Sequence, residues 1–219
     1  GAAGLAGASA GAVQEGSVGA GTGTVAFGWK GGIGTSSRTV RQGAGGADSW
    51  TVGVLVQSNY GGKLAIDGVP VWRELTPPRD RSAAVPPKGG NYMADDGSCV
   101  IVVATDAPLD ARNLQRLAAR AIFAMARTGS TYSNGSGDFA IAFTTHASQR
   151  VTGAAGPQPR TIVPTDGVSG LFEAVLDASE EAIYNSLLRA TDVTGNGRTI
   201  RAIPVEPLQG ILKKYGRGR

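Results

Sequence analysis

One stretch of the sequence decides how the rest is interpreted: Gly97-Ser-Cys-Val-Ile-Val-Val-Ala104. After its first two residues, this stretch is a continuous run of small and β-branched apolar residues, which is typical of a strand buried on both faces. Alternation along a strand places Ser98 and Val100 on one face and Cys99 on the other. We therefore expect Cys99 to be a core side chain and Ser98 to stand where a buried strand begins.

The residues ahead of this strand have a different composition. From Thr76 to Gly97 the sequence contains two Pro-Pro pairs, a Gly-Gly pair and alternating charges, without a hydrophobic period. This composition predicts an exposed loop, and a loop of this length in a compact domain is often functional. A flexible loop that ends in glycine and is followed at once by serine is what a self-cleaving N-terminal nucleophile needs.

Gly97 and Ser98 could carry out such a cleavage by themselves. Gly97 has no side chain, so its carbonyl group can be approached closely. Attack by the Ser98 hydroxyl would give an ester, and hydrolysis of the ester would free a new amino terminus. That amine would have a reference pKa of about 8 and could act as general base for its own hydroxyl. From these two residues alone, an ordinary loop-to-strand turn is the favoured interpretation.

Two other segments offer polar side chains to such a site. Ser136 and Asp138 stand two residues apart ahead of a predicted strand, so their hydroxyl and carboxylate point the same way. The Asn134-Gly135 pair before them is also the strongest short signal of a tight turn. Asn59 closes an upstream strand. Its amide could donate to an oxyanion, or it could simply be a turn residue.

The rest of the pattern predicts a layered protein. Two helices are expected, one between an N-cap at Asp110 and a stop at Gly129, the other with apolar residues at the helical period from Leu171 to Leu187. Strands are expected at residues 25–29, 33–41, 50–57, 99–104, 139–144 and 199–203. Strands that form two layers, with amphipathic helices outside them, favour an α/β sandwich that is one structural domain.

Composition excludes several classes of protein. The chain has 219 residues with one Cys and one His, so it cannot hold a Cys/His zinc site or an intramolecular disulfide. Its net charge of +4 comes from four basic residues among the last seven, so we expect no nucleic-acid partner. The apolar run that ends at Ala104 is too short to span a bilayer. The first residues are not an intact signal peptide, and we expect a cytoplasmic protein without a membrane partner whose amino terminus has been cut or truncated.

The glycine-rich segment Gly19-Ala-Gly21-Thr-Gly23 supports an alternative function. Such loops cradle phosphates when they join a strand to a helix, but here strand-like sequence follows, so tight backbone packing is favoured. A non-catalytic nucleotide-binding module stays open as an alternative. His146 is the single histidine, and we expect it to be a surface or loop residue rather than a catalyst.

Several segments together, in this order, resemble the DmpA-type aminopeptidases. This group contains the L-aminopeptidase/D-esterases and the β-peptidyl aminopeptidases and is peptidase family S58. The resemblance is carried by residues 16–23, 27–35, 52–61, 97–109, 127–130, 134–138 and 194–215. It extends over nearly the whole chain, from about Gly11 to Tyr215.

The resemblance implies a fold and a maturation step. The fold is an αββα sandwich like that of the N-terminal nucleophile hydrolases. The implied precursor cuts itself between Gly97 and Ser98. Residues 1–97 then belong to the α-subunit region, which ends in a processing loop at 76–97, and residues 98–219 form the β-subunit region. Family members have a long α-subunit portion ahead of the point where this chain begins.

The resemblance also implies a reaction. Ser98 is the nucleophile, Asn59 belongs to the oxyanion hole, and Ser136 and Asp138 support the nucleophile and its amine. The implied activity releases N-terminal residues from short peptides, amides or esters, without a metal or cofactor, in a homo-oligomer of αβ units. An acyltransferase of the ornithine acetyltransferase type is the enzymatic alternative, although that group has Thr at the position of Ser98.

Overall fold

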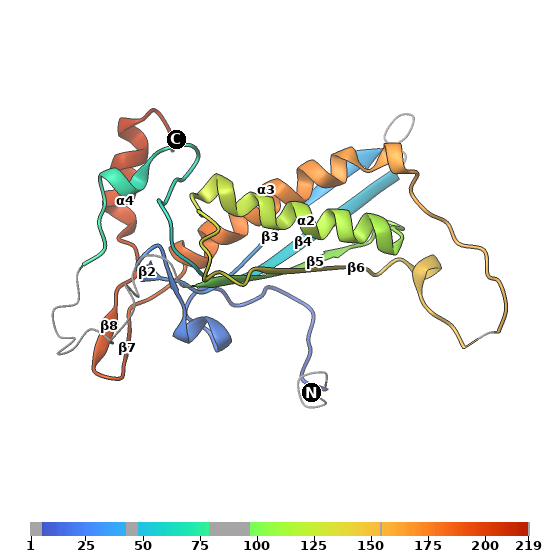
Figure 1. Cartoon of the computed structure of the whole chain (residues 1–219), viewed down its shortest axis with the longest axis horizontal. Helices are drawn as coiled ribbons and strands as arrows, with labels where there is room; N and C mark the ends of the chain where they lie inside the picture. Colours follow the sequence, from blue (N-terminus) through green and yellow to red (C-terminus); the bar gives the residue numbers. More distant parts are fainter. Residues whose placement is uncertain (1–5, 43–47, 79–96, 154, 219) are drawn as a thin grey trace.

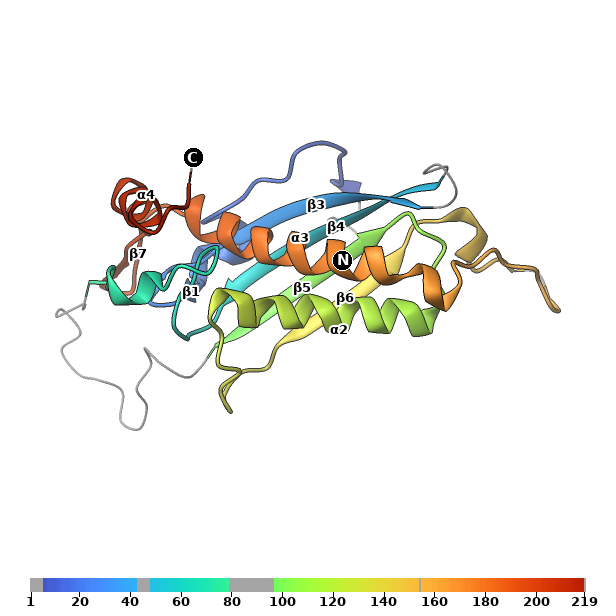
Figure 2. The same cartoon turned by 90° about the horizontal axis from the view of Figure 1, so that it is seen from above.

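One sheet of four strands organises the chain (Figures 1 and 2). The computed structural model describes residues 6–42, 48–78, 97–153 and 155–218, so most of the predicted processing loop, residues 79–96, lies outside the described residues. The strands of the sheet stand in the order β3 (Ile33–Gln42), β4 (Asp48–Asn59), β5 (Ser98–Thr105) and β6 (Phe139–Thr144).

The pairing of the strands follows from their connections. β3 and β4, which correspond to the strands predicted at 33–41 and 50–57, form an antiparallel hairpin, and β5 pairs antiparallel with β4. β6 pairs parallel with β5, which requires a crossover on one face of the sheet. Helix α2 (Ala111–Thr128) supplies that crossover. As predicted, it begins after the N-cap Asp110, which accepts a hydrogen bond from the Asn113 N–H at 2.8 Å. It ends at Gly129, whose φ is +101°.

Two helices cover one face of the sheet, as seen from above in Figure 2. α3 (Ser169–Leu188) packs over β3 and β4, and α2 packs over β6 and β5 and against α3. α3 lies close to β3 at Gly34, where a Cβ atom would overlap the Ala182 carbonyl oxygen. A glycine at this position therefore allows the helix to approach the strand.

The other face of the sheet is open in the described part of the chain. The β5 side chains of Cys99, Ile101 and Val103 are buried toward the helices, whereas Val100 is 40% exposed. The expectation that β5 is buried on both faces is therefore wrong on one face, because the described helices cover only the other. On β6, Phe139 is 65% exposed. The described residues form one sheet and one helix layer of the four layers expected.

Smaller elements gather at the end of the sheet where β5 begins (Figure 1). A single strand was predicted at 25–29, but the chain forms a small hairpin of β1 (Val25–Ala26) and β2 (Trp29–Lys30). Phe27 and Gly28 both have positive φ, 53° and 79°, which is the geometry of a tight hairpin turn. The hairpin follows η1 (Gly19–Gly23), a short 3₁₀ helix.

The carboxyl-terminal region differs from the prediction in two ways. The strand expected at 199–203 is shorter and forms a hairpin of β7 (Val193–Gly195) and β8 (Arg198–Ile200). An unpredicted helix follows, α4 (Val205–Lys214), although Leu208 and Ile211 have helical spacing. The remaining elements are short 3₁₀ helices: η3 (Val71–Arg73), η4 (Ala147–Gln149) and η5 (Thr165–Gly167). Among the described residues, none of the helices has the length and apolar character needed to cross a membrane.

We expect Gly34→Ala to lower the free energy of unfolding by about 1–3 kcal/mol, because the added methyl group forces α3 away from β3. Gly53→Ala on β4 is the matched control, since a Cβ there meets nothing nearer than the Ala104 carbonyl oxygen at 3.9 Å. Urea unfolding followed by circular dichroism compares the two variants. Equal stability of both would contradict the close approach of α3 at Gly34.

Candidate active site

Three strand ends meet at one end of the sheet and bring the predicted site residues together. Asn59 is the last residue of β4, and it pairs directly with Ser98, the first residue of β5. Residues opposite each other in an antiparallel pair project from the same face, so Asn59 and Ser98 are neighbours on one face. Asp138 immediately precedes β6, which runs parallel to β5 and therefore begins at the same end. All three residues are half-buried.

Hydrogen bonds connect the β5 and β6 ends. The Gly137 N–H donates to Ser98 Oγ at 3.0 Å. The Cys99 N–H donates to Asp138 Oδ1 at 2.8 Å, and the Ser136 hydroxyl donates to Asp138 Oδ2 at 2.9 Å. The Asp138 carboxylate thus bridges Ser136 and the backbone directly after Ser98. A hydroxyl nucleophile, a second hydroxyl and a carboxylate lie within one short network.

The orientation of the Asn59 amide is fixed by a single contact. The Val25 N–H lies 2.9 Å from Asn59 Oδ1. A backbone N–H can only donate, so the atom that faces Val25 must be the oxygen. The NH₂ group is therefore the remaining end of the amide and can donate a hydrogen bond on the side of the strand pair that carries Ser98.

Gly97 lies against the end of β4, where no side chain fits. A Cβ atom at this position would overlap the Asn59 carbonyl oxygen and stand 2.8 Å from Tyr60 Cα. The peptide bond between Gly97 and Ser98 therefore runs directly beside the residues that the sequence identified as a site. This packing accounts for a glycine at position 97, whereas attack on its carbonyl group stays a prediction.

Cys99 is a core residue, as predicted. Its side chain is fully buried, and burial, together with the nearby charge of Asp138, raises the pKa of its thiol well above the ordinary range. A thiol that stays protonated at physiological pH is a poor nucleophile. Between the two adjacent residues, the accessible hydroxyl of Ser98 is therefore the chemically available group.

His146 and the glycine-rich segment are not part of this network. His146 follows the end of β6, at the opposite end of the sheet from Ser98, and its Nδ1 pairs with Ser148 Oγ at 2.8 Å. Residues 19–23 form a 3₁₀ helix that leads into β1, so they do not join a strand to an α-helix. No group of three or more His, Cys, Asp or Glu residues in the described ranges could hold a metal ion.

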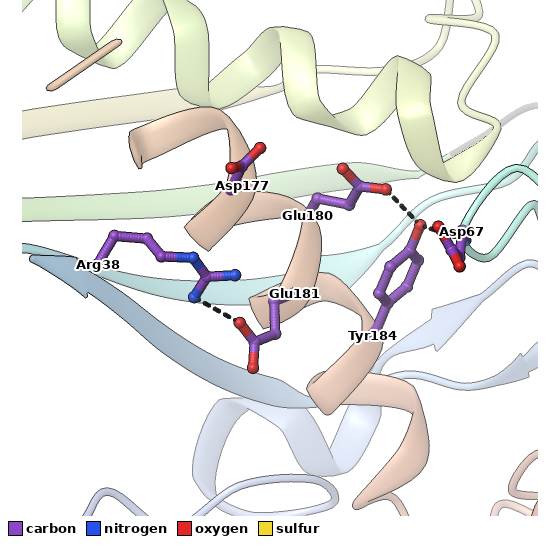
Figure 3. Close-up of a pocket in the computed structure, with 6 residues that line it drawn as sticks. All are labelled: Arg38, Asp67, Asp177, Glu180, Glu181 and Tyr184. Carbon is purple, nitrogen blue, oxygen red and sulfur yellow. Dashed lines mark hydrogen bonds and ion pairs between the residues drawn. The ribbon is translucent and has the colours of Figure 1, made fainter. Parts of the chain in front are cut away.

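A charged pocket of about 300 Å³ lies elsewhere, on the outer surface of α3 (Figure 3). Its carboxylates already have partners: Arg38 pairs with Glu181 at 2.6 Å, and the Tyr184 hydroxyl donates to Glu180 at 2.7 Å. The residues that line it are Arg38, Asp67, Asp177, Glu180, Glu181 and Tyr184. None of the predicted site residues belongs to it, and it does not resemble a catalytic site.

Sequence reasoning missed the backbone donors of the site. The N–H of Gly137 contacts the nucleophile candidate, and the N–H of Val25 orients Asn59. Gly137 lies between two residues that were identified, so its position could have suggested a role. Nothing in the sequence near Val25 signals a contact with a residue 34 positions away.

Solved structures with the same arrangement of strands and helices identify the class of protein to which this fold belongs. The L-aminopeptidase D-Ala-esterase/amidase of Ochrobactrum anthropi superposes with a TM-score of 0.82 and 35% identity, over 95% of this chain and 55% of that protein. That enzyme is described as a prototype of the serine aminopeptidases and a variant of the Ntn-hydrolase fold. A Burkholderia sp. β-aminopeptidase gives a TM-score of 0.81 and 37% identity, over 98% and 58%. The chain has the predicted Ntn-hydrolase type of fold.

Sequence comparison identifies the family. The model of peptidase family S58 matches residues 1–200. The β-peptidyl aminopeptidase BapA of Sphingosinicella microcystinivorans is 44% identical over 96% of this chain and 54% of its own length. This chain belongs to peptidase family S58, as the resemblance of its motifs predicted. It spans about half the length of the curated relatives that it matches.

We expect the Cys99 thiol to resist alkylation in the native protein, because it is buried and its raised pKa keeps it protonated. Iodoacetamide treatment up to about pH 9, followed by intact-mass analysis, tests this. The same protein in urea should take up one label, since the chain has a single cysteine. Rapid labelling of the native protein would show that Cys99 is accessible.

Proposed function

We propose that this chain carries the catalytic centre of a self-processing serine aminopeptidase or amidase. Ser98 is its nucleophile, and the α-amine freed by cleavage is its general base. The observation that supports this most strongly is the network in which Ser98 Oγ, the Cys99 N–H and the Ser136 hydroxyl meet Gly137 and Asp138. It needs no histidine, which agrees with the position of His146 at the other end of the sheet.

The proposed processing step uses the close packing at Gly97. Ser98 Oγ attacks the Gly97 carbonyl carbon, a C–O bond forms, and the C–N bond breaks as the nitrogen takes a proton. Water then hydrolyses the ester, leaving a carboxylate on Gly97 and a free amine on Ser98. This divides the chain into residues 1–97 and 98–219, which remain one structural domain because β4 and β5 are paired.

Hydrolysis of a substrate repeats the same chemistry between molecules. The Ser98 amine accepts the proton of its own hydroxyl, and Oγ attacks the substrate carbonyl to give an acyl-enzyme. The Asn59 NH₂ group donates to the oxyanion that forms. The Asp138 carboxylate, with the Ser136 hydroxyl, pairs with the ammonium group of the substrate. Release of the leaving amine and attack by water complete the cycle.

The names of the relatives support the class of substrate. One relative is named a β-peptidyl aminopeptidase, and another is named an L-aminopeptidase and D-Ala esterase/amidase. We propose short peptides, amides or esters with a free amino terminus as substrates, and a cytoplasmic homo-oligomer of αβ units as the working form. Membership of family S58 favours this hydrolase over an acyltransferase or a nucleotide-binding module.

The open face of the sheet supports the expected sandwich. Val100, Phe139, Ile141 and Phe143 are exposed apolar side chains on this face, and a patch of this kind marks a surface that another element covers. We propose that a second sheet packs there and completes the four layers. Because Ser98 projects from the same face, the site would then lie at the edge between the two sheets.

Ser98→Ala should abolish both processing and hydrolysis, because the attacking oxygen is lost. On the full-length gene product, denaturing electrophoresis and intact mass should show two fragments for the wild type, one of them starting at Ser98, and a single chain for the variant. Release of nitroaniline from alanine p-nitroanilide should disappear with it. Ser148→Ala, at the opposite end of the sheet, is the control. Cleavage of Ser98→Ala at the same bond would mean that another protease cuts it.

Asp138→Asn should weaken the preference for a free amine and shift the rise of activity toward lower pH. A carboxylate near the Ser98 amine favours its charged form, so removing the carboxylate lets the amine lose its proton at lower pH. The ratio of kcat/KM for alanine p-nitroanilide and its N-acetyl form, measured from about pH 6 to about pH 10, reports both effects. Asp166→Asn, an exposed surface change, is the control. An unchanged pH profile and unchanged discrimination would rule out this role for Asp138.

A further inference from the structure

A lysine is buried close to the site, and the described residues give it no acidic partner. Lys30 is only 1% exposed, and its Nζ donates to the carbonyl oxygens of Gly21 at 2.6 Å, Thr24 at 2.7 Å and Gly31 at 2.8 Å. None of the ion pairs among the described residues involves it. Lysine is almost never fully buried unless it is paired, because loss of hydration disfavours its charge.

The surroundings of Lys30 fit its charged form. An ammonium group has three N–H donors and no acceptor, and three carbonyl oxygens face it. A neutral amine has only two N–H donors and would leave one of these three hydrogen bonds unmade. Burial lowers the pKa of this group to about 8, so the ammonium still predominates at neutral pH. A positive charge is therefore held close to the candidate active site.

A single peptide group connects this charge to Asn59. The Thr24 carbonyl accepts from Lys30, and the Val25 N–H of the same peptide unit donates to Asn59 Oδ1 at 2.9 Å. The carbonyl and N–H of one peptide are coupled by resonance, and hydrogen bonds in a chain polarise one another. A cation on the carbonyl makes the N–H a stronger donor, which in turn polarises the Asn59 amide and makes its NH₂ group a stronger donor.

We propose that Lys30 is a positioning residue for the reaction: through the Thr24–Val25 peptide, its buried ammonium holds and polarises the Asn59 amide as the oxyanion donor beside Ser98. The proposal rests on the oxyanion role of Asn59 in the proposed function. It explains why a cation, rather than an apolar side chain, occupies a buried position whose partners in the described part of the chain are backbone carbonyl groups. Its effect should be felt mainly when negative charge develops on the substrate oxygen.

A double-mutant cycle on the full-length gene product tests this coupling. Lys30→Met should lower kcat for alanine p-nitroanilide by about tenfold or more, with little change in KM. Asn59→Ala should lower kcat by about two to three orders of magnitude. In the Asn59→Ala background, Lys30→Met should change kcat by less than about twofold, because the group through which it acts is gone.

Thermal unfolding of each variant separates coupling from general loosening of the segment. Ser17→Ala is the matched control. It removes the hydrogen bonds to the Thr191 carbonyl and N–H from a residue just ahead of the glycine-rich segment, without touching the Thr24–Val25 peptide. It should lower thermal stability but leave kcat within about twofold of the wild type. If Lys30→Met does not yield folded protein, Lys30→Gln takes its place, because it keeps neutral N–H donors for the carbonyl groups without the charge.

The outcomes are distinct. An equal loss of kcat from the Lys30 change in both backgrounds would overturn the proposal and leave the role of Asn59 intact. A loss of kcat in Ser17→Ala as large as in the Lys30 variant would overturn it as well, since loosening of the segment would then suffice. If Asn59→Ala leaves kcat unchanged, the oxyanion assignment fails, and the role of Lys30 fails with it. A loss of kcat that the Lys30 change causes in the wild type but not in the Asn59→Ala background supports the coupling.

Discussion

The pairing of β5 with a different partner on each side is the constraint on which the site depends. Its antiparallel register with β4 places Asn59 opposite Ser98, and its parallel pairing with β6 places Asp138 beside Cys99. These residues come from positions far apart in the sequence, and only the ends of three neighbouring strands bring them together. A shift of one residue in either register would turn the side chains to the other face and dismantle the network.

Close backbone packing then sets the geometry of the site. Gly97 lies against the β4 end, where a side chain would not fit, and the Val25 N–H holds one end of the Asn59 amide. The β1–β2 hairpin therefore has a role beyond connecting two segments, because it carries both Val25 and the buried cation of Lys30. The Asn59 amide, whose residue pairs with Ser98 across the two strands, is thus held by a backbone N–H rather than by a long side chain.

Much of this fold follows from local signals. The limits of α2 were predicted because Asp110 and Gly129 satisfy the ends of a helix through contacts within one turn. The hairpin turn at Phe27 was missed, since a positive φ is rare for a bulky residue and nothing local indicates it. The expectation that Ser98 and Asp138 belong to one site came from the resemblance of motifs, because the parallel pairing that brings their strands together is decided by tertiary packing. The burial of Lys30 was also missed, since composition alone places lysine at the surface.

The position of the Gly97–Ser98 bond between two adjacent strands has a consequence for the reversibility of unfolding. β4 and β5 are paired from Val52–Thr105 to Asn59–Ser98, and this pairing does not itself require an intact connection between them. An uncut chain that unfolds keeps both strands on one polymer, so they meet again at a cost set by loop closure. A cut chain that unfolds becomes two polypeptides, and their reunion depends on concentration. Recovery from heat would thus be independent of protein concentration before the cut and would fall with dilution after it, so the durability of a dilute, cut protein would be set by its rate of unfolding.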